Sequence, residues 1–186
     1  MDVAADAPWR SYVAVVPSAD ALAGIADALA PLQRAFPRAH WIAFDDIHLT
    51  LIFMAAVPAL RVPAVISAVA AAAADVEPFH IVLQGAGEFR GRGRASVSWL
   101  GIGDGAEEVR AVEAALRGRL EAIPGLESLA NDGLSVPHLT IARRAPAGLL
   151  GPLRDAFNAS GAAWSVDRVV LYRSLLGRLG ATHVPI

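Results

Sequence analysis

The sequence predicts an α+β fold built from two related halves, and two observations carry this prediction. Strand-like and helix-like patterns alternate along all 186 residues, without a low-complexity linker between them. A His-Leu-Thr triplet inside an apolar stretch occurs at 48–50 and again at 138–140. Because a chain of this length suits one domain, we expect a single unit and not two independent domains.

The first half begins with a strand, a helix and a second strand. The apolar run 11–17 predicts the first strand, and 47–54 predicts the strand that contains the first triplet. Residues 18–36 have helical spacing, with Ser18 as a candidate N-cap, and Pro31 is expected to kink or end the helix. The predicted buried side of this helix consists of Leu22, Ile25, Leu29, Leu32 and Phe36.

A second helix and a strand pair follow. The helix is expected over 61–76, where Pro63 is tolerated in the first turn. Its predicted buried side consists of Val62, Val65, Ile66 and Val69. Residues 79–85 and 95–102 predict two strands around the Gly- and Arg-rich turn 87–94.

The second half opens with the most regular helical pattern of the chain, over 104–123. Asp104 and Glu107 have the spacing of a capping box at its start. The predicted buried stripe consists of Val109, Val112, Leu116 and Leu120. The remaining elements are expected in the order strand 137–143, helix 146–160 and strand 164–174.

The charge balance and the residue types exclude several classes of function. Sixteen basic and eighteen acidic side chains give a net charge of −2, so any anionic ligand must be held by a local cluster. The absence of cysteine excludes disulfides, thiolate catalysis and cysteine-ligated zinc. Residues 1–10 lack the apolar core of a signal peptide, and no run of roughly 18 apolar residues indicates a membrane span. We expect a cytoplasmic protein with no membrane partner.

The two triplets predict a site for phosphodiester chemistry. Successive side chains of a strand point to opposite faces, so His48 and Thr50 share one face, as do His138 and Thr140. If the halves are related by a rough two-fold axis, these faces meet across one cleft. Two imidazoles then suit general acid–base catalysis near neutral pH, and the hydroxyls suit phosphate oxygens. Arg143 adds a planar cation for the charge of the transition state, and no step needs a metal or a cofactor.

Other candidate residues have simpler interpretations. A single histidine on a strand is more often structural than catalytic, and we interpret His40, His80 and His183 as surface or structural residues. Asp45 and Asp46 could orient His48, although solvation at the strand entry is the simpler role. Trp41, Trp99 and Trp164 are interpreted as core and not as base-stacking platforms. Arg90, Arg92 and Arg94 most simply form a solvated turn, though they could bind the phosphates of a polyanion.

The motif segments together resemble a known family over most of the chain. "WIAFDDIHLTLIFM" and "LSVPHLTIAR" are similar to the two motif strands of the 2H phosphoesterases (LigT-like), in particular the RNA 2′,3′-cyclic phosphodiesterases once named 2′-5′ RNA ligases. "FHIVLQGAGEFRGRGRASVSWLGIG" resembles the hairpin between them, and "VDRVVLYRSLLGRLGATHVPI" resembles the closing strand pair. The resemblance implies one bilobal domain over 1–186, with antiparallel sheets flanking a central cleft and helices on the outside.

The same resemblance implies an activity and a role for each site residue. The reaction would open a 2′,3′-cyclic phosphate to a 2′-phosphomonoester, with a weak reverse 2′-5′ ligation. His48 would protonate the departing 3′ oxygen and His138 would activate the water, although the nearly symmetric site leaves this assignment open. Thr50 and Thr140 would hold the phosphate, assisted by Arg143. The implied partners are RNA 2′,3′-cyclic phosphate ends or small cyclic nucleotides, no cofactor or metal is implied, and we expect a monomer.

Two departures from the family pattern leave alternatives open. The chain ends at "GATHVPI", where relatives often continue into a further strand, so contacts from a longer tail are in doubt. The loop "MAAVPALRVP" lacks a Gly-Glu step, which leaves open an enzyme that acts on a small cyclic nucleotide or ADP-ribose cyclic phosphate. A non-catalytic module that binds RNA ends or nucleotides is the alternative from another class. A metallohydrolase is disfavoured because neither triplet has a partner at ligand spacing.

Overall fold

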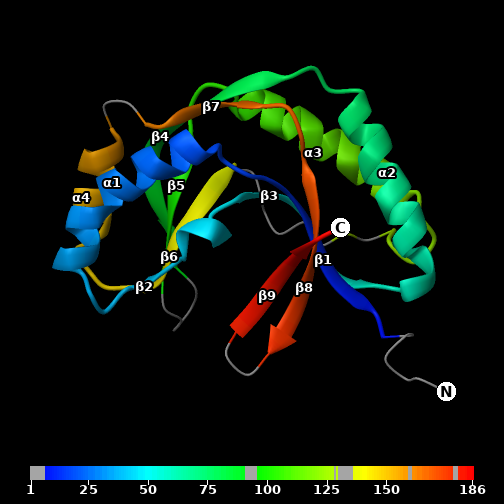
Figure 1. Cartoon of the computed structure of the whole chain (residues 1–186), viewed down its shortest axis with the longest axis horizontal. Coiled ribbons are helices and arrows are strands. Elements are labelled where there is room, and N and C mark those ends of the chain that lie inside the picture. The colour runs from blue at the N-terminus through cyan, green and yellow to red at the C-terminus, as the bar shows by residue number, and fades with distance from the viewer. Residues whose placement is uncertain (1–6, 91–95, 128, 130–135, 159–160, 178–179) are drawn as a thin grey trace.

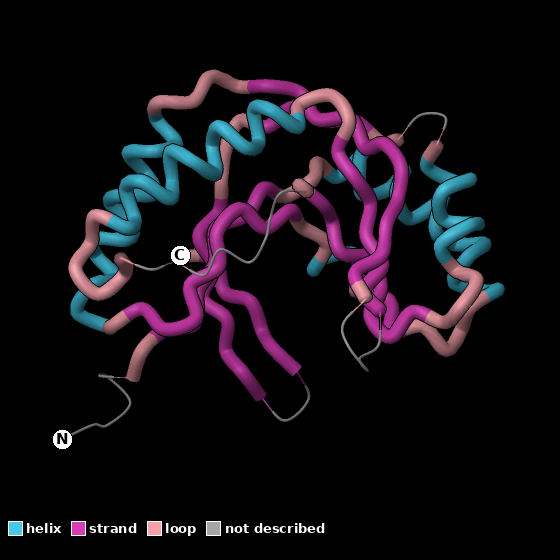
Figure 2. Tube along the Cα trace, turned by 180° about the vertical axis from the view of Figure 1, so that it is seen from behind, coloured by secondary structure: helices cyan, strands magenta, loops and turns pink. Residues whose placement is uncertain are grey.

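A computed structural model describes residues 7–90, 96–127, 129, 136–158, 161–177 and 180–186. Arg92 and Arg94 of the predicted arginine turn lie outside these residues. Figures 1 and 2 show an arch with the helices on its outer side and the strands lining the inner side. The α+β fold expected from the sequence, with helices outside antiparallel strands, is confirmed. No helix among the described residues has the length and apolarity needed to cross a membrane.

The strands form one antiparallel array. Their bounds are β1 (Trp9–Val15), β2 (His40–Trp41), β3 (Leu49–Val57), β4 (Phe79–Phe89), β5 (Ser96–Ile102), β6 (His138–Ala145), β7 (Ala163–Val166), β8 (Val170–Gly177) and β9 (Gly180–Pro185). The order across the array is β7-β4-β5-β6-β3-β1-β8-β9, with β2 beside β6. The two motif strands, β3 and β6, are therefore neighbours at the centre.

The strand order has an approximate two-fold symmetry about the junction of β3 and β6. On one side β6 is followed by β5 and β4, and on the other β3 is followed by β1 and β8. The two triplet strands exchange places under this symmetry, as do the strands beside them. The internal repeat suggested by the two triplets thus extends to the topology, although β4 and β8 each lie in the lobe formed mainly by the other half of the chain.

The helices cover the outer side in two pairs, which Figure 1 shows on opposite limbs of the arch. Their bounds are α1 (Ala19–Ala35), α2 (Val62–Ala74), α3 (Ala106–Glu121) and α4 (Leu150–Phe157). Helix α1 packs against α4, which contacts β4, whereas α2 packs against α3, which contacts β3. Short 3-10 turns precede β3 and α2, at η1 (Phe44–Asp46) and η2 (Ala59–Arg61).

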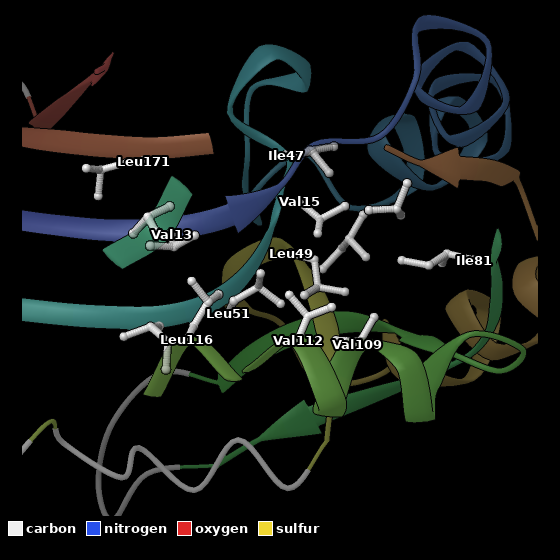
Figure 3. Close-up of a cluster of buried hydrophobic side chains, with 14 of the residues drawn as sticks. Val13, Val15, Ile47, Leu49, Leu51, Ile81, Val109, Val112, Leu116 and Leu171 are labelled. Carbon is white, nitrogen blue, oxygen red and sulfur yellow. The ribbon is translucent and has the colours of Figure 1, made fainter. Parts of the chain in front are cut away.

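A continuous apolar core joins the two lobes beneath the motif strands. In Figure 3 the side chains of α3, Val109, Val112 and Leu116, face Leu49 and Leu51 of β3. These residues and Leu139 of β6 belong to one cluster of buried side chains. Each fully buried leucine of this kind contributes about 2 kcal/mol of transfer free energy. The apolar member of each triplet thus anchors its polar neighbours to the core.

Several local predictions are wrong, each for an identifiable reason. Helix α1 does not end at Pro31 but runs to Ala35, because the proline lies near the last turn and Phe36 N–H still donates to Leu32. A kink at this proline, the other expected outcome, stays a prediction. The capping box at Asp104 is absent: Gly105 is the N-cap, with φ of 87°, and no side chain caps the helix. Ile66 of α2 is 42% exposed, while Ala72 is buried in its place.

The last predicted strand is also divided. Residues 164–174 do not form one strand: β7 ends at Val166 and pairs with β4, while β8 begins at Val170 and pairs with β1. The two pieces therefore lie at opposite sides of the array. The closing segment forms a β8–β9 hairpin, which projects from the inner side of the arch in Figures 1 and 2.

Candidate active site

The two triplets meet at the symmetry centre of the sheet. Leu49 of β3 is paired with Leu139 of β6, and both side chains are fully buried. His48 stands immediately before β3, and His138 opens β6. The strand expected over 47–54 therefore begins later than predicted, and His48 lies at its entry after the turn η1.

A bulge follows each triplet at the same position. Opposite β1, Thr50 and Ile52 face consecutive residues, so Leu51 is the extra residue in β3. Opposite β5, Thr140 and Ala142 face consecutive residues, so Ile141 is the extra residue in β6. Since a bulge reverses the alternation of side chains, two successive residues of each strand are buried, Leu51 with Ile52 and Ile141 with Ala142.

These bulges explain how Arg143 reaches the cleft. Strict alternation would place Arg143 on the face opposite to His138 and Thr140. The extra residue at Ile141 turns it back to their side, and Arg143 lines the same cleft. Phe53 occupies the corresponding position after the first triplet and also lines the cleft. The third residue after each threonine is thus directed to the ligand side by backbone geometry.

The cleft has a volume of about 580 Å³ and collects all five residues predicted for the site, His48, Thr50, His138, Thr140 and Arg143. It is also lined by residues that the sequence did not identify: Arg10, Tyr12, Trp41, Ile42, Ala43, Phe53, Ser174, Leu176, Ala181 and His183. Asp46 contributes to the wall as well. Arg10 and Arg143 outnumber this one carboxylate, so the cleft is locally cationic in a chain of net charge −2.

Both motif histidines are oriented by the same backbone contact. The Nδ1 atom of His48 lies 2.7 Å from the carbonyl oxygen of Asp46, and that of His138 lies 2.9 Å from the carbonyl oxygen of Val136. Because a carbonyl oxygen only accepts, Nδ1 must donate in both cases. The tautomer is thereby fixed, and Nε2 is the nitrogen that gains or loses a proton. The backbone of Asp46, and not its carboxylate, orients His48.

The pKa values of both imidazoles lie below the ordinary value of 6.5. Burial is the main cause for His48, and the nearby His183 and Arg143 lower its pKa further, while the contacts with Asp46 oppose the shift. Burial also lowers the pKa of His138, opposed by its donation to Val136. Charged imidazole is disfavoured at both positions until an anionic ligand enters.

Aromatic rings enclose the two histidines in different ways. The ring of Tyr12 stacks on His48 with centroids 4.8 Å apart, and Tyr172 stacks on Tyr12 at 5.0 Å, with its own ring 6.4 Å from that of His48. The ring of His138 instead meets Phe89 edge to face at 4.9 Å and Trp99 at 5.8 Å. Burial raises the pKa of Tyr12, so the ring stacked on His48 stays uncharged.

The interpretation of His183 needs correction. His183 is not a surface or structural residue without companions, because it lines the cleft with its ring 6.2 Å from that of His48. Trp164 is a core residue as expected, and the half-buried Trp41 packs against the core while it also lines the cleft. Trp99 is half-buried, with its ring 5.8 Å from that of His138. No local motif marks His183, and the resemblance to a closing strand pair gave neither the register of that pair nor the strand beside which it lies.

His40 and His80 lie outside the cleft lining, on exposed positions of β2 and β4. His80 shares a hydrogen bond of 3.2 Å with the hydroxyl of Ser165. Arg90 forms an ion pair of 2.8 Å with Glu88 in an exposed position. Among the described residues, no group of three or more His, Asp or Glu side chains is placed to hold a metal ion.

The family model of the 2′-5′ RNA ligase superfamily matches residues 15–178. The chain belongs to this superfamily. The resemblance found in the two motif strands is therefore confirmed, and the match covers both triplets and the first strand of the β8–β9 hairpin.

Individual members of this superfamily are similar to the chain in sequence and in fold. The RNA 2′,3′-cyclic phosphodiesterase of Geobacillus stearothermophilus is 28% identical over 165 residues, which cover 88% of this chain and 51% of that protein. The chain thus spans about half the length of this curated relative. The protein TT0787 of Thermus thermophilus has a TM-score of 0.75 and 25% identity, covering 95% of this chain and 94% of its own. LigT of E. coli in its apo form has a TM-score of 0.71 and 21% identity, covering 97% and 95%.

Proposed function

We propose that the protein is a metal-independent cyclic phosphodiesterase that opens the 2′,3′-cyclic phosphate at an RNA end to a 2′-phosphomonoester. One observation carries the proposal. Two imidazoles with fixed Nδ1–H tautomers, each followed by a threonine, line one cationic cleft together with a guanidinium. Superfamily membership and the name of the Geobacillus stearothermophilus relative support a cyclic phosphate as the substrate.

In the proposed reaction the two Nε2 atoms transfer protons in opposite directions. His138 accepts a proton from water while the water oxygen forms a bond to phosphorus. The bond from phosphorus to O3′ breaks, and O3′ receives a proton from His48. The product carries a 2′-phosphate and a 3′-hydroxyl, and proton exchange with solvent returns both histidines to their starting states.

The remaining site residues would bind the phosphate through the whole reaction. The hydroxyl groups of Thr50 and Thr140 would donate hydrogen bonds to its non-bridging oxygens from opposite sides of the cleft. Arg143 offers paired N–H donors, which stabilise the charge that accumulates on those oxygens in the transition state. Water attack and O3′ departure are reversible, so the same groups would support slow 2′-5′ joining when a 5′-hydroxyl replaces water.

We further propose that residues 1–186 act as one bilobal unit. The two lobes share a continuous core and each contains a strand from the other half of the chain, so neither half can complete its sheet alone. Both triplets are then positioned by the same folding event.

The proposed function is tested by hydrolysis of 2′,3′-cyclic AMP and of a short RNA with a 2′,3′-cyclic end, both in EDTA. We expect a 2′-phosphate product and a loss of kcat of about 10³-fold in His48→Ala and in His138→Ala. His80→Ala is the matched control, because this exposed histidine lies outside the cleft lining. Its kcat should equal that of the unchanged protein.

The outcomes separate this proposal from the alternatives. Turnover that survives in both single variants would contradict two-histidine catalysis. Binding of the cyclic phosphate without turnover would instead indicate a non-catalytic binding module. Faster turnover of the mononucleotide than of the RNA would identify a small cyclic nucleotide as the preferred substrate, and inhibition by EDTA would indicate a required metal.

A further inference from the structure

A third histidine enters the cleft from the closing hairpin. His183 of β9 is paired with Ser174 of β8, and both residues line the cleft on the side of His48. The hairpin that carries them projects from the inner side of the arch. This part of the wall is supplied by the last strand of the chain, far in sequence from either triplet.

The His183 ring is linked to His48 through Tyr12. It meets the Tyr12 ring edge to face, with centroids 5.2 Å apart and an angle of 82° between the planes. Tyr12 is 5% exposed and stacks on His48 at 4.8 Å. The His183 and His48 centroids are themselves 6.2 Å apart, so the three rings form one triangular cluster in which each ring restricts the movement of the other two.

The hydrogen bonding of His183 is not that of a satisfied structural histidine. Its Nδ1 is buried and has no hydrogen-bond partner among the described residues. A buried donor without an acceptor is costly, so the neutral ring keeps its proton on Nε2. Since Nδ1 is inaccessible, the ring presents other atoms to the cleft that it lines.

We propose that His183 is a positioning residue of the active site, which fixes the His48 ring through Tyr12 and couples the charge states of the two imidazoles. This inference rests on the proposed function for its catalytic consequence. The ring centroids are 6.2 Å apart, well within the screening length of about 8 Å at physiological ionic strength. A positive charge on His183 at this separation repels one on His48, and His183 accordingly lowers the pKa of His48.

The other ionisable groups around His48 come from four further elements. They are Asp46 of η1, Tyr12 of β1, Tyr172 of β8 and Arg143 of β6, with Arg10 of β1 in the same cleft. Asp46 raises the pKa of His48, whereas His183 and Arg143 lower it. His183 is the only imidazole among these causes. Among the described residues, no charged group is a cause of the shift at His138, whose pKa is lowered by burial and raised by its donation to Val136.

The direct experiment is an NMR titration of the His48 imidazole without substrate. His183→Phe keeps an aromatic edge against Tyr12 but removes the charge, and His183→Gln removes the ring as well. In both variants we expect the His48 midpoint to move to higher pH, while the His138 midpoint stays in place. His80→Phe is the matched control, because it removes an exposed imidazole outside the cleft lining.

Kinetics distinguish the positioning role from the charge coupling. In His183→Phe we expect the limb of the kcat/KM profile that belongs to His48 to move to higher pH. In His183→Gln we expect, in addition, a loss of kcat of about tenfold with little change in KM, because Tyr12 loses its lateral contact and His48 its fixed geometry. A merely structural residue would lower stability without moving either limb.

An unchanged His48 midpoint in both variants would overturn the proposal. If the variants fail to fold, the unchanged protein still decides it: a His48 midpoint that does not change with ionic strength would contradict the charge coupling. The titration needs no turnover, so a missing shift contradicts the role of His183, whereas missing hydrolysis contradicts the proposed function.

Discussion

The two halves of the cleft share a backbone arrangement and differ in what surrounds it. Each half has a histidine held by a carbonyl two residues earlier, a buried leucine and a threonine, followed by a bulge. The surroundings are unlike. His48 lies among Tyr12, Tyr172 and His183, all of which carry an ionisable group, whereas His138 lies against Phe89 and Trp99, which carry none.

In the proposed mechanism, this difference would let a symmetric site carry out an asymmetric reaction. A cyclic phosphate presents two equivalent non-bridging oxygens, which suit a duplicated pair of hydroxyls. Hydrolysis needs one protonated and one neutral imidazole, which two identical environments would not provide. We infer that the repeated backbone binds the phosphate, and that the side chains outside the repeat distinguish the acid from the base.

The largest contrast lies at the position after each bulge, which is Phe53 in one half and Arg143 in the other. We expect Arg143→Ala to lower kcat/KM by about 10²-fold, because the transition state loses its paired donors. Arg143→Lys should recover only part of the loss, since an ammonium is a point charge without the planar fork. The measurement is steady-state hydrolysis of a nucleoside 2′,3′-cyclic phosphate.

Phe53→Ala is the matched control for that comparison. Phe53 occupies the equivalent place and has the Arg10 guanidinium 4.3 Å from its ring centroid, but it carries no charge. We expect kcat/KM to fall less in Phe53→Ala than in Arg143→Ala, mainly because KM rises. Equal losses in kcat from both variants would show that the two halves contribute alike, and would contradict the division of roles.

The opposite roles proposed for the two histidines also predict the pH dependence of kcat/KM and of kcat. The pKa values of His48 and His138 are both lowered from 6.5, mainly by burial. Below its pKa the base is protonated and inactive, and above its pKa the acid has lost its proton, so kcat/KM should be bell-shaped with both limbs below pH 6.5. The limbs of kcat should lie at higher pH, because the bound anion favours both charged imidazoles. A limb of kcat/KM above pH 6.5 would contradict these shifts.

The sequence was sufficient for the parts of the molecule that depend on local pattern. Strand alternation around each triplet, with Leu49 and Leu139 as buried anchors, correctly placed the polar faces together, because a side chain's face follows from its position in a strand. The helical stripe of Val109, Val112, Leu116 and Leu120 is buried as predicted.

Features that depend on pairing between distant strands could not be predicted in this way. The bulges at Leu51 and Ile141 arise from register against β1 and β5, and they change the face of every later residue in the strand. Alternation alone therefore gave no reason for Arg143 to reach the cleft; its inclusion came from family resemblance and motif proximity. His183 was missed because its place depends on the β8–β9 hairpin and on where β8 joins the sheet.

The smallest expected effect concerns the wall behind His138. Gly87 of β4 is paired with Trp99 of β5, and a methyl group at Gly87 would overlap the indole ring. Gly87→Ala should therefore displace Trp99 and lower the free energy of unfolding by about 1–3 kcal/mol. Because Trp99 contacts His138, the His138 titration should change while that of His48 does not.

Gly118→Ala provides the opposite control in the same chain. Gly118 is an exposed residue of α3 with open space at its Cβ position, so alanine should stabilise the helix by about 0.5–1 kcal/mol. For both variants, chemical denaturation would measure the free energy of unfolding, and an NMR titration would measure the midpoints of His48 and His138. A shift at His48 in Gly87→Ala would mean that the two walls are mechanically joined, and the independent surroundings inferred for the two imidazoles would have to be abandoned. A shift confined to His138 would show that Gly87 and Trp99 set the environment of His138 without affecting that of His48.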